Sequence, residues 1–256
     1  MAHSSVRGAA SEPRRGSSAD ASLPHICLLS NGSYTVMLTE AGSGYSARDG
    51  LDVTRWREDA TRDCWGQHYY IRDLDGRRAW STGRQPLGGD ADTYEAFLDP
   101  DRAVFLRRDA DIETRYEVAV AADVDTEVRR ITLTNHGASS RTLEVTSYVE
   151  VALNHRAADQ AHPAFAKLFL ETEYLAAPPT LLCRRRPRAR DQKPIWALHF
   201  LAGPEDGTSV ERVEYETDRA RFLGRGRSAA CPAALDPGVV LSGTVGPVLD
   251  LSLIHI

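Results

Sequence analysis

Apolar and polar residues alternate along residues 143–153, and this alternation is the feature that most constrains the fold. A period of two residues is typical of a β-strand with one buried face. The buried side of this strand is expected to comprise Leu143, Val145, Ser147, Val149, Val151 and Leu153. Residues 112–120 repeat the pattern, and no long segment keeps a period of 3.6 residues. The sequence therefore predicts an all-β fold, most simply a sandwich of two large antiparallel sheets.

Turn-forming residues divide the rest of the chain into short strands. Asn31-Gly32 separates Ile26–Leu29 from Tyr34–Leu38, which indicates a hairpin because Asn-Gly adopts the positive φ angles of a tight turn. A second hairpin is predicted for His68–Arg72 and Arg78–Ser81. Further strands are expected at Thr93–Leu98, Ala103–Arg107, Glu127–Thr134, Trp196–Leu201 and Ser209–Glu216. Residues 161–174 fit either a short helix or a loop followed by a strand, and Pro163 favours the loop and strand.

Composition excludes several classes of protein. The 256 residues carry a net charge of −5, and the pI is near 5.9, so general nucleic-acid binding is not expected. No apolar run approaches the roughly 20 residues of a membrane-spanning helix. Four cysteines lie far apart without a CxxC pair, which favours reduced thiols in the cytoplasm over structural zinc. Neither a metal nor a cofactor is expected.

The two ends of the chain differ from its middle. Residues 1–24 are rich in Ser, Ala, Arg and Gly and have no apolar stretch, so they are predicted to be a flexible leader or linker and not a signal peptide. The β-domain is assigned to residues 25–250. The last six residues, LSLIHI, match a translation of transposase adapter DNA, and residues 251–256 are therefore predicted to be non-native. A genomic read that still encodes LSLIHI would refute this prediction.

The segment from Leu29 to Ser81 carries the candidate binding residues. They are aromatic, cationic and acidic side chains in a connection where small turn residues would be usual: Tyr45, Arg55, Trp56, Arg57, Asp59, Asp63 and Trp65. A sugar packs its C–H face on an indole and pairs its hydroxyls with arginine and carboxylate groups, so carbohydrate is the leading ligand. The same residues could instead form a structural cluster of ion pairs and indoles. No catalytic pair is assigned to Asp59 and Asp63.

Other charged or histidine-containing segments favour structural roles. Arg184–Arg190 lacks interleaved aromatic residues and is interpreted as a solvated loop. Arg219–Arg227 has no Lys-Ser or Lys-Thr pair, so it is not a nucleotide-binding phosphate loop. The eight histidines show neither HxH nor HExxH spacing.

Several ordered segments resemble one family of carbohydrate-active enzymes. They are LLSNGSYTVMLTEAGSGYS, VTRWREDATRDCWG, YYIRDLDGRRAWSTGRQP, EVRRITLTN, LEVTSYVEVAL, AHPAFAKLF and EYETDRARFLGRGR. Together they make the chain similar to the N-terminal supersandwich domain of glycoside hydrolase family 94, formerly glycosyltransferase family 36, and above all to the phosphorylase-like region of cyclic β-1,2-glucan synthases. The resemblance implies a galactose-mutarotase-like β-supersandwich that precedes an (α/α)6 catalytic barrel.

The resemblance also implies a function. Family members cleave β-glucosidic bonds with inversion, and phosphate replaces the water that a second carboxylate would otherwise activate. The general-acid Asp would lie in the barrel, so no catalytic residue is assigned here. We expect a non-catalytic domain that contacts β-glucan, positions the barrel and could support a homodimer, within a parent enzyme that could be attached to the bacterial inner membrane. The alternatives are a free-standing carbohydrate-binding module and a dimerisation scaffold without a ligand.

Overall fold

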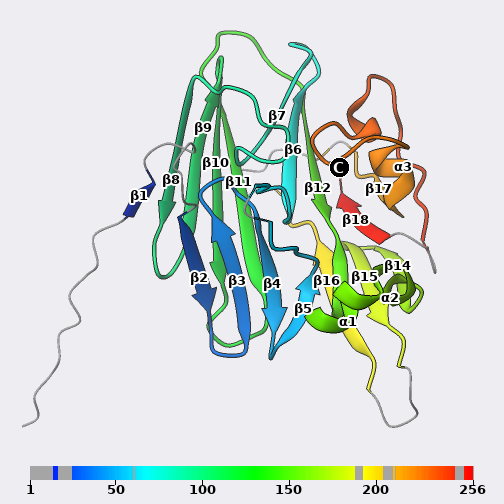
Figure 1. Ribbon diagram of the computed structural model, residues 1–256. Helices are drawn as coiled ribbons and strands as arrows, with labels where there is room; N and C mark the ends of the chain where they lie inside the picture. The colour runs from blue at the N-terminus through cyan, green and yellow to red at the C-terminus, as the bar shows by residue number, and fades with distance from the viewer. Residues whose placement is uncertain are drawn as a thin grey trace, which may run out of the picture.

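Antiparallel strands form nearly all of the regular structure, as the sequence predicts. The computed structural model describes residues 14–16, 25–59, 61–187, 193–203, 210, 212–245 and 251–255. Its strands pair into three five-stranded sheets and one three-stranded sheet (Figure 1). The prediction of an all-β sandwich is confirmed.

Two of the sheets face each other. The front sheet has the order β13-β5-β4-β3-β2, with β2 Ile26–Ser30, β3 Tyr34–Thr39, β4 Gly44–Arg48, β5 Leu51–Thr54 and β13 Val151–His155. The back sheet has the order β1-β8-β9-β10-β11, with β1 Arg14–Gly16, β8 Thr93–Leu98, β9 Ala103–Asp109, β10 Ile112–Val120 and β11 Glu127–Asn135. Leu29, Val36 and Leu38 pack against Phe105 and Tyr116 to form the core between them.

A third sheet extends the sandwich on one side (Figure 1). Its order is β17-β18-β12-β6-β7, with β6 His68–Asp73, β7 Arg78–Ser81, β12 Leu143–Val149, β17 Tyr215–Asp218 and β18 Leu251–His255. Ile71 of β6 packs with Ile112 of the back sheet. Tyr70 points to the opposite face, where it packs with Phe222 of α3 (Arg219–Leu223) and Ala234 of the 3₁₀ helix η1 (Ala233–Leu235).

The small sheet consists of β14 Leu170–Ala176, β15 Pro179–Arg185 and β16 Ile195–Phe200. Leu170, Leu181 and Cys183 from its inner face pack against Val151 and Leu153 of β13. Two short helices, α1 Arg156–Ala161 and α2 Pro163–Lys167, connect β13 to β14. No described helix is long and apolar enough to cross a membrane.

The predicted strand over residues 143–153 is wrong in its length. The chain breaks at Glu150, so that β12 joins the third sheet while β13 joins the front sheet. From Thr146 to Asn154 both faces of the segment are buried, so the expectation of a single buried face is also wrong for this part of the chain. The loop expected before residue 170 is also wrong. Pro163 begins α2 instead of preventing it, because the first turn of a helix needs no N–H from proline.

Other segments refine the prediction. Both predicted hairpins are present, and the Asn31 side chain accepts hydrogen bonds from the N–H groups of Ser33 and Tyr34. The strand expected at 209–216 begins only at Tyr215, and residues 209 and 211 lie outside the described part. Arg185 is buried in β15, which corrects the solvated loop, although residues 188–190 are not described. Of the predicted leader, only Arg14–Gly16 is described.

Candidate functional site

The loop of residues 55–67 connects β5 to β6 and begins with a buried arginine. Arg55 is 4% exposed. Its Nε and Nη2 atoms donate to the two carboxylate oxygens of Asp159 at 3.0 and 2.9 Å. Its Nη1 atom donates to Glu150 at 3.2 Å. The Arg55 guanidinium therefore links the loop to α1 and to the break between β12 and β13.

Two further arginines complete this group. Arg57 donates to Asp159 at 2.7 Å, and Arg219 of α3 donates to Glu150 at 2.7 Å. We call Arg55, Arg57, Glu150, Asp159 and Arg219 the arginine–carboxylate network. Its contacts join residues that lie between 69 and 104 positions apart in the sequence, and they hold the start of the loop against α1 and α3.

Both carboxylates of the network remain ionised. Burial alone would raise the pKa of Glu150, but Arg219 and Arg55 outweigh it and the pKa lies below its usual value. Burial would likewise raise the pKa of Asp159, but Arg55 and Arg57 outweigh it and the pKa is lowered overall. A general acid must hold a proton near the working pH. These two carboxylates consequently serve as fixed anions and not as proton donors.

Positive charge exceeds negative charge around the network. Burial, together with the charge of Arg55, lowers the pKa of Lys167 in α2 to about 8. Three arginines and this lysine thus surround two carboxylates. Arg57 and Arg219 are the partly exposed members of the network, with side chains 24% and 31% exposed.

An aromatic pair lies beside the network. The rings of Tyr45 in β4 and Trp56 have centroids 5.5 Å apart at 50°, and both side chains are half-buried. The guanidinium carbon of Arg156 lies 4.6 Å from the Tyr45 ring centroid and 5.6 Å from the Trp56 centroid. Asp52 accepts two hydrogen bonds from Arg156, at 3.0 and 2.9 Å. Tyr45, Trp56 and Arg156 form a surface of two rings and a planar cation.

The remaining predicted residues lie along the same loop. Asp59 is exposed and accepts hydrogen bonds from the N–H and hydroxyl of Thr61, at 2.9 and 2.7 Å. Asp63 accepts a hydrogen bond from Thr39 at 2.8 Å. The carbonyl of the half-buried Trp65 accepts one from the N–H of Gly44 at 2.7 Å. The structure therefore brings Tyr45 and Trp56 together, whereas Asp59 contacts only its own loop and Asp63 is bonded to β3.

The sequence analysis missed four residues of this region: Glu150, Asp159, Arg156 and Arg219. Glu150 falls within the alternating segment of residues 143–153 but not among the residues expected to be buried. Arg219 lies in the Arg219–Arg227 segment, for which only a phosphate loop was considered. No spacing pattern connects these residues to Arg55, because their contacts depend on how the sheets meet.

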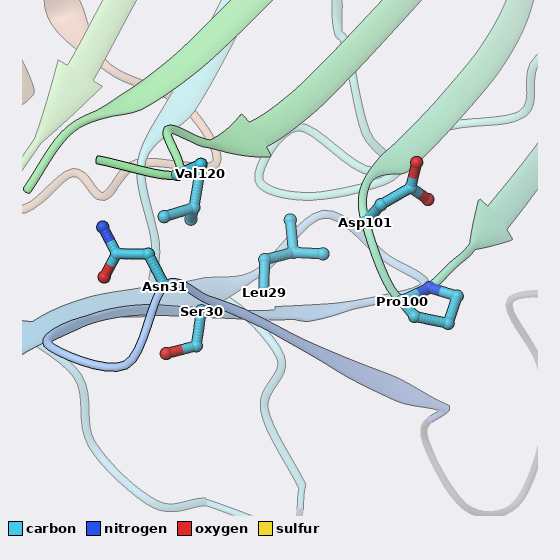
Figure 2. A pocket seen from close by; sticks show the side chains of 7 residues that line it. Leu29, Ser30, Asn31, Pro100, Asp101 and Val120 are labelled. Carbon is cyan, nitrogen blue, oxygen red and sulfur yellow. The ribbon is translucent and has the colours of Figure 1, made fainter. Parts of the chain in front are cut away.

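A separate hollow of about 310 Å³ lies at the tip of the β2–β3 hairpin (Figure 2). Leu29, Asn31, Pro100 and Val120 contribute to its wall, with Asp101 at its side. It contains none of the predicted binding residues. Within the described ranges, no group of His, Cys, Asp and Glu side chains could hold a metal ion.

Comparison with known proteins identifies the family. The model of the glycosyl hydrolase 94 supersandwich domain matches residues 12–255. The chain is 39% identical over 223 residues to the cyclic beta-(1,2)-glucan synthase NdvB of Rhizobium meliloti (strain 1021), a match that covers 87% of the chain and 8% of that relative.

Two disaccharide phosphorylases are more distant relatives. The N,N'-diacetylchitobiose phosphorylase of Vibrio proteolyticus is 25% identical over 224 residues, which cover 86% of this chain and 27% of the relative. The solabiose phosphorylase of Paenibacillus borealis is 24% identical over 172 residues, which cover 67% and 21%. The matched region spans no more than about a quarter of any of these relatives. By its match to the family model over nearly its whole length, the chain belongs to the glycosyl hydrolase 94 supersandwich-domain family.

Proposed function

We propose that this chain is the non-catalytic β-domain of a larger enzyme that processes β-glucans, and that Tyr45 and Trp56 contact the glucan. The observation that carries the proposal is the similarity to the cyclic beta-(1,2)-glucan synthase over 223 residues. A second domain, expected to be an (α/α)6 barrel, would supply the catalytic acid. This division of labour agrees with the ionised state of Glu150 and Asp159, which makes both unsuitable as acids.

The network gives Trp56 a defined position. Its two sequence neighbours, Arg55 and Arg57, are both held by Asp159, and its carbonyl accepts a hydrogen bond from Arg57 at 3.2 Å. A contact residue that is already ordered loses less entropy when a ligand binds. The indole is therefore suited to stack on a sugar ring, while the nearby guanidinium groups are suited to its hydroxyls. Arg57, Asp59, Asp63 and Trp65 remain predicted contacts, whereas Arg55, also predicted to bind, is 4% exposed and holds the loop instead.

Affinity electrophoresis tests the proposal. The chain is run through gels that contain β-1,2-glucan, β-1,4-glucan or an α-glucan as the control polysaccharide. We expect retardation by β-glucan and at least about a tenfold loss of affinity in Trp56→Ala. Leu74→Ala is the matched control, because Leu74 is 45% exposed in the β6–β7 turn. Equal retardation of the wild type and Trp56→Ala would contradict the assignment of Trp56.

A further inference from the structure

The outer face of the small sheet carries large exposed apolar side chains. Trp196, Leu198 and Phe200 of β16 are 48%, 62% and 57% exposed. The alternate residues of the strand face inward, and Ile195 and Ala197 among them pack on the core. β16 is the edge strand of its sheet within the described part of the chain (Figure 1). Contiguous exposed apolar side chains of this kind mark an interaction site.

Charged residues share this face with the aromatic ones. The strand register places Glu171 of β14, Arg184 of β15 and Trp196 in one row across the sheet. Arg184 Nε donates to Glu171 at 3.0 Å, and the guanidinium carbon lies 5.3 Å from the Trp196 ring centroid. This contact orients the indole through a cation–π interaction. A carboxylate, a guanidinium and an indole thus lie side by side on an open surface.

The spacing on β16 suits an elongated ligand. Trp196 and Phe200 are four residues apart and point to the same side, which separates them by about 13 Å along the strand. Leu198 lies between them, so the surface is continuous. A single sugar ring is too short to cover both aromatic side chains, whereas a chain of several sugars can lie across them.

The acidic residues decide between a sugar and an apolar protein surface. Glu171 and the exposed Glu173 belong to the same outer face as Leu198. Glu171 is already paired with Arg184, but the exposed Glu173 would lose its water to an apolar protein partner without gaining a hydrogen bond, which is costly. Sugar hydroxyls can donate to the carboxylates while the C–H faces of the rings pack on the aromatic side chains.

We propose that this surface, defined by Glu171, Glu173, Arg184, Trp196, Leu198 and Phe200 and called here the β16 face, is a second glucan-binding site. It would take an extended β-linked glucose oligosaccharide that lies across Trp196 and Phe200. The inference rests on the proposed function for its ligand class, but it concerns a surface separate from Tyr45 and Trp56. A second site would hold a long glucan near the enzyme while another part of the same glucan is processed.

Fluorine NMR can test the two sites separately. The chain contains four tryptophans, so incorporation of 5-fluorotryptophan gives four resonances, which single Trp→Phe variants assign. We expect a β-1,2-glucan oligosaccharide to shift the Trp196 resonance in a saturable manner. Trp80 is 3% exposed in the core, and its unchanged resonance reports that the fold is intact. Phe200→Ala should weaken the Trp196 response at least about fivefold, whereas Val128→Ala, at a similarly exposed residue of the back sheet, should not.

The outcomes separate this inference from the proposed function. A shift of Trp196 alone supports the β16 face and contradicts the assignment of Trp56. A shift of Trp56 alone supports the proposed function and overturns the inference. If the Trp196 resonance does not shift with glucan but changes with protein concentration, the inference is also overturned. The β16 face would then be a contact between copies of the chain. A response to glucan at neither tryptophan refutes both sites.

Discussion

Replacement of Asp159 by asparagine tests whether the arginine–carboxylate network holds the loop in place. The amide keeps the shape of the side chain but removes its charge. Arg55 then retains only Glu150 as an anionic partner, and the amide turns an NH₂ group toward one of the guanidinium donors. Because Asp159 and Arg55 are 1% and 4% exposed, water cannot replace the lost interaction.

The expected cost follows from burial. Removal of one partner from a buried ion pair typically costs about 3–5 kcal/mol. The contact with Arg57 adds little, since that side chain is 24% exposed and a solvated pair contributes about 1 kcal/mol or less. For a domain of this size, 1 kcal/mol corresponds to about 2–4 °C. We therefore expect Asp159→Asn to lower the melting temperature by about 6–20 °C.

Thermal unfolding followed by circular dichroism measures the change in melting temperature, and urea unfolding measures the loss of about 3–5 kcal/mol. Asp59→Asn is the matched control, because Asp59 is an exposed carboxylate of the same loop and should change stability by no more than about 0.5 kcal/mol. The pKa values of Asp159 and Glu150 are lowered in the folded protein. Their contribution is thus present above the unfolded values of 3.8 and 4.5 and is lost as the pH falls below them. A loss below about 1 kcal/mol in Asp159→Asn at neutral pH would refute this account of the network.

Three further predictions concern the β-domain. Burial lowers the pKa of His68 to about 4 from 6.5, so its neutral form adds stability that is complete above pH 6.5 and is lost toward pH 4; a His68→Gln variant should lack this part of the pH dependence, about 3 kcal/mol. Gly44→Ala would place a Cβ atom 1.9 Å from the carbonyl oxygen of Met37, so it should lower the free energy of unfolding by more than about 3 kcal/mol. In Gly50→Ala the new Cβ atom meets nothing within 4 Å, and the loss measured by urea unfolding should be about 1 kcal/mol. Cys231 is exposed and Cys183 is buried, with burial raising the pKa of Cys183 to about 12; a thiol reagent followed by peptide mapping should label Cys231 first and Cys183 only on unfolding, and early labelling of Cys183 would contradict the packing of the small sheet.

Local sequence patterns determine the hairpins of this fold, and these could be predicted. The hairpin of β2 and β3 follows from Asn31-Gly32 and two short apolar runs, all within fifteen residues. The break at Glu150 could not be predicted, because the alternation of apolar residues continues from β12 into β13 without interruption. The sequence left a short helix after β13 as the less favoured alternative, because each helix there is only five or six residues long, too short to display a helical period.

In the candidate site, too, the local residue pattern could be predicted and the long-range contacts could not. The residue types of the loop single out Arg55 and Trp56, and the structure places both at the start of the loop. Their partners could not be inferred, because Glu150 and Asp159 lie 95 and 104 residues from Arg55. Only the meeting of the front sheet, the third sheet and α1 brings these side chains together. The sequence identified which segment is unusual, and the fold determines which of its residues are buried and which are accessible.

Calorimetric titration of the 256-residue chain with cyclic β-1,2-glucan is the most direct test of the central claim, that this β-domain itself contacts glucan through the surface of Tyr45 and Trp56. The account predicts saturable binding by the wild type that Trp56→Ala weakens at least about tenfold, with both proteins unfolding at similar urea concentrations. No binding by a folded wild-type chain at millimolar glucan, or binding that Trp56→Ala leaves unchanged, would contradict it.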